Sequence, residues 1–334
     1  GWFLVLSWHH ITELIQHGDD NLVDDRLRFI RRLPAIAWIR SYRGELNIGA
    51  ITDLLAHEVS VAISGETVDC IEVASKVREN VFDVGTGELA LDQYEELWEF
   101  LKATSRDRQE RKREIASLAR TAVFDDDSEP LRPFFEGRLR SRDSASKKLE
   151  SLMRTLTEGL EAHGDSRIPD AAKTAKVFFD EIAQDGESLY DHQRSPMAAY
   201  LDGFGINVAQ LDLDGPRRQL YDIIEFQQKL RVLDGQMRVP WKELSQTDPD
   251  LIPSWQIQRA CRLHPAPATR AKGSDIDDMH IACLAPYCDR TFVDKRTYES
   301  FRRTTKKNST VKLLARSIRK ARSYQEAIKQ VLST

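Results

Sequence analysis

Residues 273–296, GSDIDDMHIACLAPYCDRTFVDKR, decide how this chain is interpreted. They gather acidic side chains around a short apolar helix and a short strand. Asp277 or Asp278 is expected in the first turn of the helix, where the positive end of the helix dipole favours an ionised carboxylate. Residues 290–293 indicate a strand, and Asp294 follows at its carboxyl end, the edge at which open α/β sheets bind ligands. Two acids placed in this way are suited to a Mg²⁺ or Mn²⁺ site.

This pattern resembles the C-terminal half of a PIN-like nuclease domain, a family in which one Asp opens a late helix and another ends the next strand. The resemblance rests on Ser-Asp-Ile-Asp-Asp-Met-His, Ala-Pro-Tyr-Cys-Asp and Phe-Val-Asp-Lys-Arg. It implies that Asp278 takes the helix position and Asp294 the strand-end position. The alternative or supporting polar groups that it implies are Asp275, Asp277, Asp289 and His280.

The N-terminal residues are similar to the start of the same family. Residues 2–6 indicate a buried strand, and Ser7 is a plausible N-cap for the helix that follows. A contact between Ser7 and His10 would be capping. The resemblance implies that Glu13, on this early helix, is a further metal ligand, and the alternative is a solvated helix residue. The family's first Asp and its strand have no counterpart here. Since the chain starts at Gly1 without Met, we expect it to begin partway through the fold.

The resemblance implies metal-dependent hydrolysis of a phosphodiester, with the chain as an endoribonuclease. Glu13, Asp278 and Asp294 would then hold one or two Mg²⁺ or Mn²⁺ ions that activate water and stabilise the leaving oxygen. RNA, or single-stranded DNA, would contact the basic residues that follow Asp294, which are Lys295, Arg296, Arg302, Arg303, Lys306 and Lys307. Two alternatives stay open: a catalytically degenerate PIN-like module that binds nucleic acid or protein, and a helical interaction protein whose acids cap a helix.

Between the two ends, helical periodicity predominates. We therefore predict an α/β fold that is helix-dominated overall. Its PIN-like core, Rossmann-like with a mainly parallel sheet, is formed by residues 1–44 and 265–334 and is split by an all-α insertion of residues 45–264. No convincing strand alternation occurs between residues 45 and 241. His57 and Glu58 are neighbours in a predicted helix and point apart, which excludes a chelating pair. A later helix is predicted to start near Ser254, with Ser254 as its cap.

Composition bounds the class of protein. The chain of 334 residues is long enough for two domains. Its net charge of −4 gives no overall attraction to nucleic acid, so any such contact must be a local patch. No apolar run approaches the ~20 residues of a membrane span, and no nucleotide-cradle or zinc-protease motif is present. The four cysteines show no CxxC pair, so we expect free thiols in a reducing cytoplasm.

Overall fold

The computed structural model describes residues 2–44, 47–105, 107, 128–132, 142–163, 168, 170–177, 180, 201, 205–206, 211–263 and 274–333. The contacts within the chain divide it into two compact units. The first unit comprises Gly1–Gln109, Leu230–Thr269 and Ser274–Thr334, and the second comprises Glu110–Lys229 and Arg270–Gly273.

The first unit and the predicted core have different limits. Residues 47–105 and 230–263 were predicted to be part of the insertion, but they belong to the first unit. The physical reason is helix packing: α3 (Ile51–Ile63) contacts both α4 (Cys70–Arg78) and α13 (Pro253–Leu263). Periodicity indicates that such helices have a buried face, but it does not say which partner covers that face.

A three-stranded sheet of mixed direction has the order β1-β2-β3. Strand β1 (Val5–Leu6) runs parallel to β2 (Ile36–Ile39), and β3 (Phe82–Gly85) runs antiparallel to β2. Strand β3 corrects the expectation that residues 45–241 lack strands. Its sequence FDVG is too short to show alternation, and the strand forms through tertiary pairing with β2, with Asp83 Oδ1 2.8 Å from Arg40 Nε across the pair.

A second, two-stranded sheet is parallel. It consists of β4 (Thr291–Val293), at the predicted position, and β5 (Ile318–Lys320), which the sequence analysis did not predict. The connection between them contains α15 (Lys295–Thr304) and α16 (Ser309–Leu314), as parallel pairing requires a crossover. The described part of the chain is thus dominated by helices, with small sheets of mixed direction.

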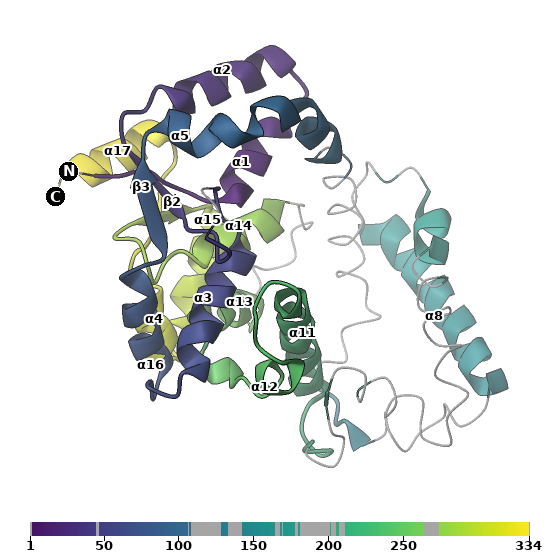
Figure 1. The fold of residues 1–334 in the computed structure, drawn as a ribbon. Helices are drawn as coiled ribbons and strands as arrows, with labels where there is room; N and C mark the ends of the chain where they lie inside the picture. Colours follow the sequence, from purple (N-terminus) through teal and green to yellow (C-terminus); the bar gives the residue numbers. More distant parts are fainter. Residues whose placement is uncertain are drawn as a thin grey trace. The chain divides into compact units, whose positions relative to one another are not determined.

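Further helices of the first unit follow along the chain (Figure 1). They are α1 (Trp8–Ile15), α2 (Asp20–Arg31), α5 (Gly87–Leu91), η1 (Asp92–Leu97), α12 (Trp241–Leu244), η4 (Pro249–Leu251), α14 (Ser274–Ala282) and α17 (Tyr324–Leu332). Among the helices described, none has the combination of length and apolar character that crossing a membrane requires.

Helix α1 begins after Ser7, the predicted N-cap. The backbone N–H of Ser7 donates to Nδ1 of His10 at 3.0 Å, so these two residues form the expected local capping contact. Burial lowers the pKa of His10 to about 4. The ring is therefore neutral near pH 7, as an Nδ1 acceptor must be.

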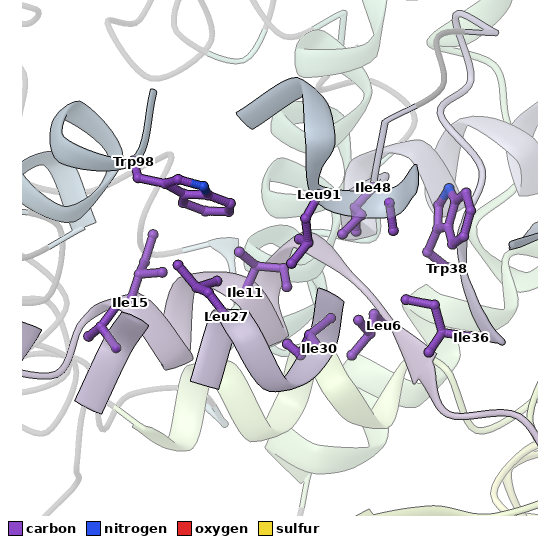
Figure 2. Close-up of a cluster of buried hydrophobic side chains, with 12 residues drawn as sticks. Leu6, Ile11, Ile15, Leu27, Ile30, Ile36, Trp38, Ile48, Leu91 and Trp98 are labelled. Atoms are coloured by element: carbon purple, nitrogen blue, oxygen red, sulfur yellow. The ribbon is translucent and has the colours of Figure 1, made fainter. Parts of the chain in front are cut away.

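One apolar core joins the N-terminal helices to the first sheet. Figure 2 shows side chains from β1, β2, α1 and α2 facing one another, with Leu91 and Trp98 closing the cluster. Helices α2 and α5 lie side by side, and Gly87 makes this approach possible. A Cβ atom at Gly87 would lie 1.8 Å from the carbonyl oxygen of Ile30, so no other residue fits there without movement of the backbone.

The second unit has a small apolar cluster of its own. The second unit contains α8 (Arg142–His163) and most of α11 (Arg217–Asp234). The residues of α11 from Leu230 onwards belong to the first unit. The buried residues of the cluster are Leu131, Leu201, Ile206 and Leu220. An ion pair between Glu129 and Arg217, with 2.7 Å between Oε2 and Nη2, joins a short segment to the start of α11.

Candidate functional site

Asp294 ends β4 and caps α15. Its Oδ1 accepts the backbone N–H of Thr297 at 2.6 Å, and its Oδ2 lies 3.5 Å from Nε of Arg296. The strand-end position predicted from the sequence is therefore correct. An Asp at this position satisfies a backbone N–H that has no partner within the helix, which typically stabilises a helix by about 1 kcal/mol.

Helix α14 begins at Ser274, so Asp277 is the fourth residue and completes the first turn, where one of the two acids was expected, and Asp278 begins the second turn. A helix start at Ser274 places Asp275 nearest the positive end of the helix dipole, a position that favours an acid. Asp277 is buried, with 4% of its surface exposed, and Asp278 is half-buried. The side chain of Asp275 lies outside the described part of the structure.

Helix α14 contacts both α1 and β4. The rings of His280 on α14 and His9 on α1 have centroids 4.4 Å apart and are tilted by 58°. Glu13 follows His9 by four residues, which places both on one side of α1, and its side chain is exposed. The three elements that carry Glu13, Asp278 and Asp294 are thus neighbours.

The described side chains do not form the three-carboxylate site implied by the resemblance. Among them, no three His, Cys, Asp or Glu residues come together as a group that could hold a metal ion. One reason is visible at Asp294, whose Oδ1 is occupied by the helix cap. In this arrangement the described residues therefore do not form a Mg²⁺ or Mn²⁺ centre.

Asp289 lies in the loop before β4 and makes a surface ion pair. Its Oδ1 is 2.6 Å from Nη2 of Arg78 on α4, and 69% of its side chain is exposed. The contact ties the loop to α4. An exposed pair of this kind contributes little to stability, typically 0–1 kcal/mol.

The outer side of α15 is basic. The helix buries Ser300, Phe301 and Thr304. Lys295 and Arg302, which are seven positions apart, lie on the opposite, exposed side. We define the α15 basic face as the exposed cations of this helix, of the turn after it and of β5, namely Lys295, Arg302, Arg303, Lys306, Lys307 and Lys320. Arg296, also predicted to contact nucleic acid, is half-buried and pairs with Asp294.

Opposite charge on this face is sparse. Glu299 of α15 lies 2.9 Å from Arg302 and 3.7 Å from Lys320. Residues 302–322 contain nine Lys or Arg residues and no Asp or Glu, in a chain whose net charge is −4. The segment is therefore a concentrated positive region within an acidic protein.

Sequence reasoning missed the most deeply buried carboxylate described, that of Glu58 on α3. Its Oε1 accepts the hydroxyl of Tyr287 at 2.6 Å and the backbone N–H of Ser254 at 3.0 Å, and its Oε2 accepts the Ser254 hydroxyl at 2.5 Å. We call Glu58, Ser254 and Tyr287 the Glu58 cluster. Ser254 is the second residue of α13 and not its cap, because the helix starts at Pro253, and Glu58 accepts the backbone N–H of Ser254 at that end.

Burial raises the pKa of Glu58 to about 7, and the hydrogen bonds from Ser254 and Tyr287 oppose this rise. Burial and the neighbouring Glu58 carboxylate together raise the pKa of Tyr287 well above its usual value. The sequence contains a signal for this burial, because Glu58 follows Leu54 and Leu55 by four and three residues and so lies on the apolar face of α3. His57 instead has its Nε2 3.1 Å from the carbonyl oxygen of Arg40, so the two neighbours do have separate partners.

Comparison of the chain with models of known protein families, with curated proteins and with solved structures found no match.

Proposed function

We propose that this protein binds nucleic acid, with RNA as the expected partner, through the α15 basic face. The observation that carries the proposal is the run of nine cations without an acid in residues 302–322, five of which belong to this face, within a chain of net charge −4. Concentrated cations attract the phosphate backbone and release its counterions, a term that supplies most of the affinity for nucleic acid in sequence-independent binding.

The arrangement of the face suits a backbone contact. Lys295 and Arg302 follow one another along the exposed side of α15, and Lys306 lies in the turn after it, so successive phosphates can meet successive cations. The guanidinium of Arg302 already forms an ion pair with Glu299 at 2.9 Å. An incoming phosphate can replace this carboxylate, since Arg binds both groups with the same forked geometry.

Salt-dependent RNA binding tests the proposal. The variant Lys306→Gln/Lys307→Gln is compared with the control variant Lys173→Gln/Lys242→Gln, which changes the charge by the same amount. The two lysines of the control are also exposed but do not belong to the α15 basic face. Fluorescence anisotropy with a labelled oligouridylate should show weaker binding by the first variant alone. Its slope of log affinity against log salt should fall by about 1.4, or ~0.7 for each lost phosphate contact on a single strand. Absence of salt-dependent binding by the parent protein, or an equal loss in both variants, would refute the proposal.

Metal-dependent phosphodiester hydrolysis by Glu13, Asp278 and Asp294 is the second candidate. It is favoured by one observation, that α14 contacts both α1 and β4, the elements that bear the other two acids. Cleavage of RNA in the presence of Mn²⁺ should be lost in Asp278→Asn and kept in Asp289→Asn, a control on the surface ion pair with Arg78. Equal cleavage by both variants, or none by the parent protein, would leave binding as the proposal.

A further inference from the structure

We infer that the nucleic acid held at the α15 basic face is unpaired there, with a base stacked on the ring of Tyr324. This inference rests on the proposed function and deepens it, since it specifies a single strand as the ligand. It depends on where one exposed aromatic ring lies relative to the cations.

Tyr324 is the first residue of α17 and has 72% of its surface exposed. The residue before it, Ser323, caps the helix by accepting the N–H of Glu326 at 3.3 Å. The helix start is therefore held by Ser323, and Tyr324 is not needed for it. A large aromatic ring left this open contributes little to packing and is available to a ligand.

Tyr324 lies close along the chain to Lys320 of the basic face. Lys320 of β5 joins the face to α15, because its Nζ is 5.1 Å from the ring centroid of Tyr298 and 3.7 Å from Glu299. Tyr324 follows Lys320 by four positions, so their Cα atoms are at most ~14 Å apart. Helix α17 also turns back to β5, where Nε2 of Gln330 donates to the carbonyl oxygen of Lys320 at 3.2 Å.

Cations and an exposed aromatic ring have complementary tasks in binding a single strand. The cations hold the phosphates, and the ring stacks on a base whose face is free. In a duplex the base faces are already stacked on their neighbours, so an exposed tyrosine gains no such partner. A purely electrostatic surface would not distinguish the two forms in this way.

Substitutions of Tyr324 distinguish base stacking on its ring from another role of this side chain. Ile328 and Leu332, 52% and 73% exposed, follow at helical spacing and extend an apolar stripe. If Tyr324 only served that stripe, Leu would replace it. Base stacking requires an aromatic ring, so Tyr324→Phe should bind the single strand as tightly as the parent protein does. Tyr324→Leu and Tyr324→Ala should bind it more weakly. Phe100→Ala, at an aromatic residue 68% exposed on another part of the unit, is the matched control.

The experiment measures the affinity of each full-length variant for three probes by fluorescence anisotropy. These are an oligouridylate of about 20 nucleotides, longer than the ~4–16 nucleotides that one such site covers, an oligothymidylate of the same length, and an RNA duplex of the same length. We expect Tyr324→Ala to weaken binding to the single strands about 5- to 150-fold, the range for loss of one stacked base. The salt slope should not change, because tyrosine carries no charge. Duplex binding should be weaker than single-strand binding in the parent protein and unaffected by the substitution.

The outcomes separate the two proposals. If the parent protein binds none of the probes in a salt-dependent way, the proposed function fails and this inference fails with it. If it binds, but Tyr324→Ala matches the parent protein or Tyr324→Leu retains full affinity, the inference is overturned and the electrostatic binding stands. Comparison of the two single-stranded probes then shows whether the 2′-hydroxyl of RNA is read.

Discussion

Carboxylates from two regions of the first unit make different contacts. The acids of residues 275–294 stand out in the sequence, yet Asp294 caps a helix and Asp289 forms an exposed ion pair. Glu58 lies in an ordinary helical stretch and is fully buried, where it accepts hydrogen bonds from α13 and from Tyr287. The difference shows that a visible concentration of acids does not identify the carboxylate on which packing depends most, since burial and partners determine that dependence.

The largest effect is expected from Glu58→Leu. Leucine leaves the N–H and hydroxyl of Ser254 and the hydroxyl of Tyr287 buried without their acceptor, and each such group costs about 1–3 kcal/mol. The free energy of unfolding should fall by ~3–5 kcal/mol at about pH 5, where Glu58 is protonated in the folded state. Urea unfolding followed by tryptophan fluorescence measures it, because all six tryptophans lie in the first unit. A loss below ~1 kcal/mol would contradict the hydrogen bonding described for the Glu58 cluster.

The next effect is a pH dependence that Glu58→Gln removes. Burial raises the pKa of Glu58 from 4.5 to about 7, so the folded state holds a proton that the unfolded chain releases across this window. The contribution of Glu58 to stability is therefore fully present below pH 4.5 and is lost as the pH rises to about 7. Relative to the parent protein, Glu58→Gln should gain ~3 kcal/mol of unfolding free energy across that window. Urea unfolding of both proteins as a function of pH gives this difference, and parallel curves would show that Glu58 does not titrate there.

A smaller effect is expected from Asp294→Ala, which removes the cap of α15. Loss of the hydrogen bond to the N–H of Thr297 should lower the free energy of unfolding by about 1 kcal/mol, as for other helix caps. Asp294→Asn is the control, since Asn caps a helix about as well as Asp. Thermal unfolding of the two variants compares them directly, and equal stability of the Ala and Asn variants would mean that the cap contributes nothing.

The smallest effect is expected from Asp289→Asn. Its ion pair with Arg78 is largely exposed on both sides, so the change in unfolding free energy should stay below about 0.5 kcal/mol and shrink further in salt. Urea unfolding at low and high ionic strength provides the measurement. A loss as large as that of Asp294→Ala would remove the distinction drawn between capping and exposed ion pairing.

Local patterns were sufficient for several elements. Ser7 precedes α1 as predicted because a hydroxyl residue before an apolar helical repeat is a local signal. Strand β4 and the position of Asp294 at its end were also predicted, since β-branched and aromatic residues bounded by charged ones indicate a short strand. The cations of residues 302–322 are a property of the sequence itself, and the exposure of Arg302 and Arg303 follows from the apolar spacing of α15.

Tertiary structure alone decided the rest. The FDVG stretch becomes β3 because β2 offers it hydrogen bonds, and residues 318–320 become β5 because β4 does. Helices α3 and α13 belong to the first unit because they pack on each other, although they are far apart in the chain. The same packing buries Glu58 against Ser254. Periodicity shows which face of a helix is buried, and only the partner on that face determines whether a carboxylate there is satisfied.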